Sequence, residues 1–95
     1  MTKDIQQIQE KILPILKEAG VLRSSIFGST ARGEATTESD VDILVETPGH
    51  YGLFKFLGIK ADLEDALGKK VDLIEFQAIK PALKENILKD QVVIF

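Results

Sequence analysis

The sequence predicts an α/β fold of the α+β type, a two-layer sandwich with a small mixed β-sheet and helices on one face. Short runs rich in Val and Ile alternate with amphipathic segments of helical length, which is the pattern of a layered α/β protein. The chain has 95 residues, of which 44% are hydrophobic. That length supports one core and is too short for two separate domains. We therefore expect a single domain over residues 1–95.

Composition and charge narrow the classes of function. The chain has no cysteine and one histidine, which excludes thiolate and imidazole metal sites and leaves oxygen ligands. A net charge of −3 argues against direct binding of nucleic acid through broad phosphate neutralisation. The N-terminal segment lacks the apolar core of a signal peptide, and no apolar run reaches membrane-spanning length. We expect a cytoplasmic protein.

The N-terminal segment predicts an amphipathic helix over about Asp4 to Ala19, closed by Gly20. Four isoleucines recur at helical spacing within it: Ile5, Ile8, Ile12 and Ile15. Pro14 conflicts with this pattern, because proline removes an amide donor and crowds the preceding turn. We expect the helix to kink or restart at this residue.

The remaining elements are predicted in the order strand, strand, helix, strand, helix, strand. The first two strands are "VLRSSIF" (21–27) and "SDVDILVE" (39–46), and the second ends at Pro48 and Gly49. A helix follows over Leu53 to Leu67, capped by Gly68. The strand "VDLIEF" (71–76) leads to a helix over 77–90 that tolerates Pro81 near its start, and "QVVIF" (91–95) closes the chain as a short edge strand.

Two carboxylates stand in the second strand, in an otherwise apolar run. Because strand side chains alternate, Asp40, Asp42, Leu44 and Glu46 face one way, and Val41, Ile43 and Val45 form the core face. Asp40 and Asp42 are then roughly 6.5–7 Å apart along the strand, a separation that suits a shared metal ion. The alternative is that Asp40 simply starts the strand, since an isolated Asp-x-Asp is weak evidence. Glu46 is interpreted as a surface residue at the strand end.

A third carboxylate joins this pair if the strand over 71–76 lies beside the second in register, because Asp72 sits early in it. Carboxylates that converge in a partly dehydrated site repel one another, so they take up protons or hold cations. Mg²⁺ suits such a site, since it prefers oxygen ligands and is often shared with nucleotide phosphates.

A glycine-serine turn follows the first strand. Gly28 allows the backbone to approach a phosphate, while "STARGE" can form a helical turn with free amides, and Ser29 and Arg32 add a hydroxyl and a positive charge. An ordinary serine-capped turn is the alternative. A phosphate cradle beside a metal-binding pair is the arrangement that nucleotidyl transfer needs.

The segment "GSTARGEATTESDVD" resembles the signature of the minimal nucleotidyltransferase domains of the DNA polymerase β-like superfamily: Gly-Ser, a ten-residue spacer and Asp-x-Asp. In addition, "LGKKVDLIE" resembles the later family strand that carries the third acidic residue, and "ALKENILKDQVVIF" resembles the closing helix and strand. The resemblance covers nearly the whole chain and implies the nucleotidyltransferase fold.

The resemblance also implies roles for individual residues. Gly28 and Ser29 would hold the β- and γ-phosphates of a nucleoside triphosphate, and Arg32 would stabilise the triphosphate or the leaving pyrophosphate. Asp40 and Asp42 would bind two Mg²⁺ ions. Asp72 would complete the site as a metal ligand or as the general base.

Family members are often encoded beside a HEPN-domain ribonuclease toxin and act as its antitoxin. The resemblance therefore implies transfer of AMP from ATP to a tyrosine hydroxyl of such a toxin, bound as a hetero-oligomer. The apolar segment "GLFKFLGI" is also typical of a surface covered by another chain. Two alternatives stay open: an antitoxin that neutralises its partner by binding alone, and a nucleotidyltransferase subunit that acts on a small molecule or RNA. No direct contact with nucleic acid or membrane is expected.

Overall fold

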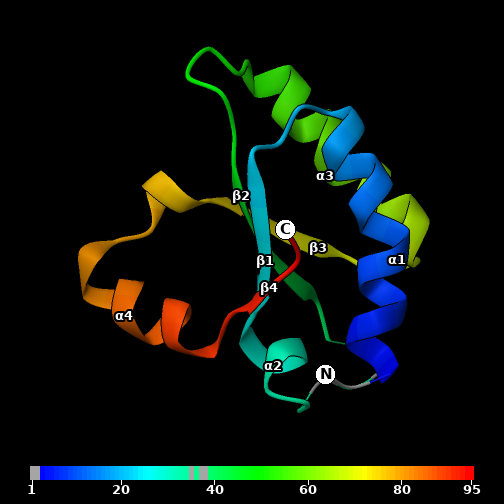
Figure 1. Cartoon of the computed structure of the whole chain (residues 1–95), viewed down its shortest axis with the longest axis vertical. Helices are drawn as coiled ribbons and strands as arrows, with labels where there is room; N and C mark the ends of the chain where they lie inside the picture. Colours follow the sequence, from blue (N-terminus) through cyan, green and yellow to red (C-terminus); the bar gives the residue numbers. More distant parts are fainter. Residues whose placement is uncertain (1–2, 35, 37–38) are drawn as a thin grey trace.

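A computed structural model describes residues 3–34, 36 and 39–95. Its helices and strands follow the predicted order (Figure 1). They are α1 (Lys3–Glu18), β1 (Arg23–Phe27), α2 (Gly28–Ala31), β2 (Val41–Glu46), α3 (Leu53–Leu67), β3 (Val71–Glu75), the 3-10 turn η1 (Phe76–Ala78), α4 (Pro81–Asp90) and β4 (Val92–Val93). The last helix begins four residues later than predicted, because a residue that precedes proline disfavours helical geometry and η1 forms separately.

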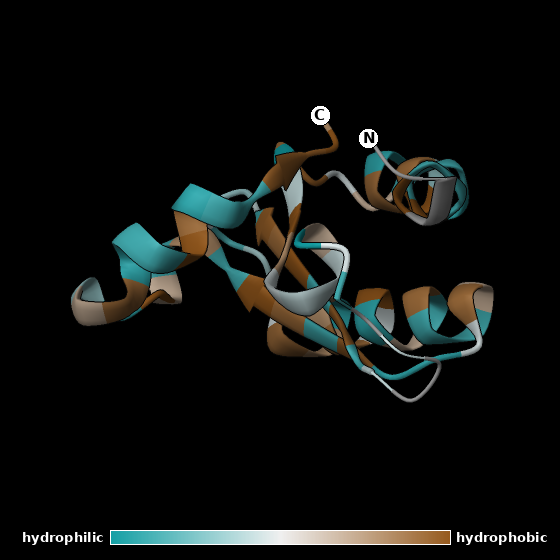
Figure 2. Cartoon of the chain, turned by 90° about the horizontal axis from the view of Figure 1, so that it is seen from below, coloured by the Kyte–Doolittle hydropathy of each residue, from teal (hydrophilic) through white to brown (hydrophobic). Residues whose placement is uncertain are grey.

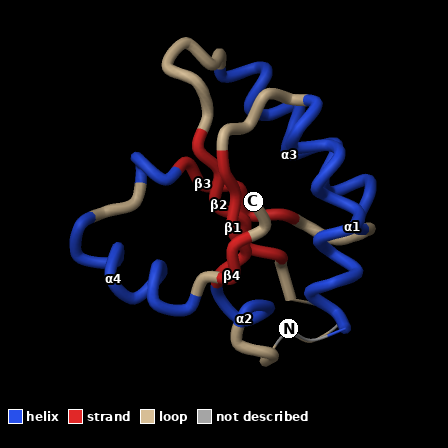
Figure 3. The backbone as a smooth tube through the Cα atoms, viewed as in Figure 1, coloured by secondary structure: helices blue, strands red, loops and turns tan. Residues whose placement is uncertain are grey.

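The strands form one mixed sheet in the order β3-β2-β1-β4. β1 pairs antiparallel with β2 and β4, whereas β2 and β3 run parallel. Figure 3 shows the strands gathered at the centre of the molecule with the helices around them. The predicted α/β class with a small mixed sheet is confirmed, as is the predicted edge position of the C-terminal strand. This topology brings the end of β1 and the starts of β2 and β3 to the same edge of the sheet.

The main core lies between the sheet and the pair α1 and α3. Val41, Ile43 and Val45 of β2 are buried in this core, as their alternation predicted. Ile12 of α1 and Leu63 of α3 meet them, and both are fully buried. One face of the sheet is therefore buried against α1 and α3.

The helices differ from the prediction in one respect, because they do not all cover the same face. α4 lies on the opposite side of the sheet from α1 and α3 (Figure 2). A second apolar cluster forms there around Phe27, Leu44 and Phe76, with Ile87 and Leu88 of α4 packed against it. Leu44 points away from the main core and is still fully buried. Leaving such a side chain in water would forfeit about 2 kcal/mol, so the face that carries it needs a cover.

The restart that was one of the two outcomes expected at Pro14 does not occur, because α1 runs through this residue as one helix of 16 residues. Ile12 and Leu16, on either side of the proline, are both fully buried. Burial of these side chains outweighs the lost backbone hydrogen bond. Pro14 itself is exposed.

The start of α3 carries an exposed apolar surface. Leu53 and Leu57 are substantially exposed, and 90% of the Phe54 surface is open to solvent. Farther along the same helix, Ile59 and Leu63 are buried. Within the described part of the chain, no helix is both long and apolar enough to cross a membrane.

Candidate functional site

The glycine-serine turn and the carboxylate strand meet at the edge where β1 ends. Gly28 follows β1 directly and has a φ of +71°, a left-handed conformation that favours glycine. A Cβ atom at this position would collide with Oδ2 of Asp42 and lie 3.1 Å from its Cγ. Glycine is therefore favoured twice, by the backbone angle and by the carboxylate, which would have to move away from an added Cβ atom.

The turn after β1 forms α2, a helix of four residues. Its N-cap residue is Phe27, whose side chain provides no capping hydrogen bond. The backbone amides of Arg32 and Glu34 donate to the carbonyls of Gly28 and Ser29 at 3.1 and 2.9 Å and close the turn. Ser29 lies inside the helix, so the alternative of a serine-capped turn is wrong. The amides of a first turn have no partner within the helix, and they favour anions.

Asp42 and Asp72 are direct partners in the parallel ladder between β2 and β3. The strand adjacency on which the third carboxylate depended is thus confirmed. Burial raises the pKa of Asp42 above its ordinary value, and the negative charges of Asp72 and Asp40 raise it further, while Arg32 opposes them. Asp42 therefore lies where negative charge is already concentrated.

The carboxylates fit a divalent cation without forming a complete cage. Over residues 3–34, 36 and 39–95, no three His, Cys, Asp or Glu side chains gather closely enough to hold a metal ion. Asp40 precedes β2 and is exposed, whereas Asp42 and Asp72 are paired across the strands. Mg²⁺ is commonly bound through one or two carboxylates together with substrate phosphates. The repulsion at Asp42 and the adjacent glycine turn suit that mode.

Arg32 lies beside this turn and is held by two carboxylates. Its Nε is 3.1 Å from Oε2 of Glu34, and its Nη1 is 3.5 Å from Oδ2 of Asp90. Neither partner was anticipated as part of the site. The close spacing in sequence could have suggested Glu34, but the contact with Asp90 depends on where α4 packs. The guanidinium keeps its charge and lies within electrostatic reach of Asp42.

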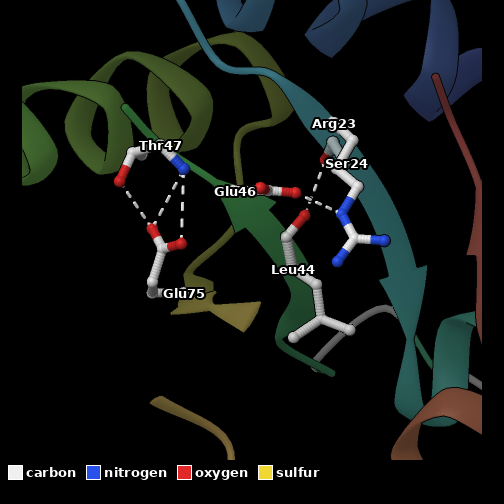
Figure 4. Close-up of polar contacts among 6 residues, drawn as sticks. All are labelled: Arg23, Ser24, Leu44, Glu46, Thr47 and Glu75. Atoms are coloured by element: carbon white, nitrogen blue, oxygen red, sulfur yellow. Dashed lines mark hydrogen bonds and ion pairs between the residues drawn. The ribbon is translucent and has the colours of Figure 1, made fainter. Parts of the chain in front are cut away.

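Polar contacts secure the opposite ends of the same strands (Figure 4). Arg23 at the start of β1 forms an ion pair with Glu46 at the end of β2, where a surface residue was predicted. Glu75 accepts hydrogen bonds from the amide of Thr47, at 3.2 Å, and from its hydroxyl, at 2.7 Å. These contacts hold β2 in register with both neighbours and thereby hold Asp42 opposite Asp72.

Comparison with known families agrees with this geometry. The sequence profile described as "Nucleotidyltransferase domain" matches residues 9–94. The chain belongs to the nucleotidyltransferase domain family. A protein of Methanocaldococcus jannaschii proposed to be a protein adenylyltransferase is 46% identical over 89 residues, which span 94% of this chain and 96% of the relative. Protein adenylyltransferase MntA of Thermococcus cleftensis is 40% identical over 73 residues, 77% of this chain and 74% of that protein.

Several solved structures share the fold. A candidate minimal nucleotidyltransferase superposes with a TM-score of 0.82 at 32% identity, over 95% of this chain and 92% of that one. A toxin-antitoxin complex with AMP-PNP matches at 0.80 and 21% identity, over 92% and 72% of the two chains. A complex of tri-AMPylated Shewanella oneidensis HEPN toxin with MNT antitoxin matches at 0.74 and 20% identity, over 95% and 71%.

Proposed function

We propose that this nucleotidyltransferase is a Mg²⁺-dependent protein adenylyltransferase that transfers AMP from ATP to a tyrosine hydroxyl of a HEPN-domain toxin and acts as its antitoxin. The observation that carries the proposal is the contact between the Gly28 turn and Asp42, with Asp72 alongside. The names of the relatives support the adenylyl group, and the fold shared with toxin-antitoxin complexes supports the kind of partner.

In this proposal the turn after β1 holds the triphosphate. The backbone at Gly28 and the hydroxyl of Ser29 bind the β- and γ-phosphates, since the first turn of α2 has no side-chain cap. Arg32 exchanges its contacts with Glu34 and Asp90 for phosphate oxygens, to which a guanidinium can donate in a bidentate manner. The leaving pyrophosphate then remains beside a fixed positive charge.

Asp40, Asp42 and Asp72 are the proposed oxygen ligands of magnesium. When bound, magnesium would neutralise the phosphates and increase the acidity of the acceptor hydroxyl. The acceptor oxygen forms a bond to the α-phosphorus. The bond between the α-phosphorus and the oxygen that bridges to the β-phosphorus breaks, and pyrophosphate leaves. Asp72 either receives the hydroxyl proton or would ligate the metal, in which case the proton passes to solvent. Its exposed position on β3 is open to an incoming side chain.

A hetero-oligomer fits the surface of the chain. Leu53, Phe54 and Leu57 give the start of α3 an apolar surface without cover from the described residues of this chain. Burial of such residues between two chains would favour association by the hydrophobic effect. We assign this surface to the contact with the toxin.

The test combines the chain with ATP, MgCl₂ and the HEPN-domain protein encoded beside it. Mass spectrometry should detect at least one added AMP, located on a tyrosine, and EDTA should abolish the modification. Asp42→Asn is the matched control and should retain the complex while losing transfer. Neutralisation of the toxin by Asp42→Asn at full strength, without added AMP, would instead identify an antitoxin that acts by binding alone.

A further inference from the structure

A cavity of about 190 Å³ lies outside the glycine-serine turn. It lies between the start of β1, the turn η1 and α4. Its lining consists of two cationic, two amide and two apolar side chains: Arg23, Lys84, Gln77, Gln91, Phe76 and Leu88. Neither the carboxylates nor the glycine-serine turn contributes to this lining.

The cavity lies on the same side of the sheet as the carboxylates. Asp42 pairs with Phe27, and four residues farther along the two strands Glu46 pairs with Arg23. On β3 the same interval separates Asp72 from Phe76. Four residues of extended strand span about 13 Å. A polypeptide that reaches Asp72 with one side chain can therefore occupy this cavity with residues about four positions away.

The lining combines hydrogen-bond donors that have no partner among the described residues with the apolar side chains of Phe76 and Leu88. The guanidinium of Arg23 stacks on the ring of Phe76, with 4.2 Å between its central carbon and the ring centroid. Its Nε is occupied by Glu46, while the two terminal nitrogens point away from that carboxylate (Figure 4). Lys84 forms no ion pair with the described residues. Such a site suits a ligand that is both carboxylated and partly apolar.

We propose that this cavity, which we call the acceptor pocket, binds acidic residues of the polypeptide that receives the nucleotidyl group. The inference rests on the proposed function, because it assumes a protein acceptor. Its acidic residues stand about four positions from the modified tyrosine. The nucleobase of ATP is the less suitable ligand for this pocket. Only a ribose separates the base from the α-phosphate that we place at Asp42, whereas the pocket is about 13 Å from Asp42.

The test uses two peptides and the full ¹⁵N-labelled chain. Acetyl-Glu-Glu-Gly-Gly-Gly-Tyr-amide should shift the amide signals of Arg23, Gln77, Lys84 and Gln91, and the analogue with two lysines in place of the glutamates should not. Lys84→Glu should weaken binding of the acidic peptide about tenfold by replacing an attractive charge with a repulsive one. Lys89→Glu, the same change on the same helix outside the lining, should leave the affinity unchanged.

Each outcome has a separate meaning. Equal binding of the two peptides, or equal loss in both lysine variants, would overturn the acceptor pocket. Shifts of the lining signals by AMP-PNP in place of the peptide would assign the cavity to the nucleotide and would also overturn it. Selective binding of the acidic peptide supports the pocket even when ATP and Mg²⁺ give no AMP on the tyrosine, a result that would count against the proposed function alone.

Discussion

Gly28 meets two separate structural requirements. Its backbone is left-handed, and its missing side chain leaves room for the carboxylate of Asp42. Gly20, by contrast, has a φ of +84°, and a Cβ atom added there would meet no described atom within 4 Å beyond its chain neighbours. Alanine substitutions at Gly28 and Gly20 therefore separate the free-energy cost of the backbone angle from that of the contact with Asp42.

Gly28→Ala should lower the free energy of unfolding by about 2 kcal/mol or more, because it adds a collision to the left-handed strain. Gly20→Ala should lose only about 1 kcal/mol, the cost of the angle alone. Urea unfolding followed by circular dichroism measures both values. Equal losses in the two variants would mean that the contact with Asp42 has no energetic weight.

Asp42 should destabilise the fold at neutral pH when no metal is bound. Its pKa is raised in the folded protein, first by burial and then by Asp72 and Asp40, so the folded state holds this proton more tightly than the unfolded chain. The ionised carboxylate of Asp42 is therefore the form that the folded protein disfavours. The Asp42 carboxyl therefore does not change the free energy of unfolding below its ordinary pKa of 3.8, and it lowers that free energy as the pH rises from there through the raised pKa.

In EDTA, Asp42→Asn should raise Tm at pH 7 by about 3 °C, a modest gain because the site is open to solvent screening. The difference should vanish near pH 3, where the wild-type side chain is protonated as well. Thermal unfolding at the two pH values measures the effect. A variant that is less stable than the wild type at pH 7 would show that the charge of Asp42 is compensated in the folded protein.

At the scale of elements, local patterns predicted most boundaries, and the exceptions have physical causes. α3 begins and ends where predicted, and it ends there because Gly68 adopts the left-handed cap conformation with a φ of +66°. α1 continues through Pro14 because buried side chains on both sides hold it. Helix breaking by proline is a local preference, and tertiary packing overrode it here.

Pro14→Ala should raise the free energy of unfolding by about 1–2 kcal/mol, because it restores a backbone donor in the interior of a helix. Pro81→Ala should change it by less than about 0.5 kcal/mol, since proline is well tolerated in the first turn of α4. Both residues are exposed, so packing changes little. Chemical denaturation compares them, and equal effects would contradict this account of Pro14.

At the scale of the whole molecule, the C-terminal strand joins both ends of the chain to one core. β4 pairs with β1, and the amide of Ile94 donates to the carbonyl of Ser24 at 2.9 Å. Ile94 is buried in the main core that α1 also covers, whereas the preceding Val93 is 61% exposed. Two adjacent residues of one segment thus have opposite surroundings.

Ile94→Ala should lower the free energy of unfolding by about 3 kcal/mol through loss of buried volume. Val93→Ala should cost less than about 1 kcal/mol, mostly through reduced strand preference. Urea titrations of the two variants provide the comparison. Similar losses would mean that β4 contributes through its backbone pairing and that Ile94 adds no packing energy.

The parts of this protein that follow from sequence alone are those that depend on neighbours along the chain. The helical spacing of Ile5 and Ile12 predicts the buried face of α1, and both side chains are buried. The alternation in β2 places Ile43 on one face of the strand and the carboxylates on the other, because strand side chains repeat with a period of two. The motif likewise predicts one site for the Gly28 turn and Asp42, which are close in the sequence.

Tertiary structure decided the contacts that join distant segments. Asp72 lies opposite Asp42 because β3 runs parallel beside β2. Asp90 reaches Arg32 because α4 covers the second face of the sheet, where Leu44 needs burial. Such contacts depend on which strands pair and which faces must be shielded from water, and these are properties of the assembled chain and not of any local stretch of sequence.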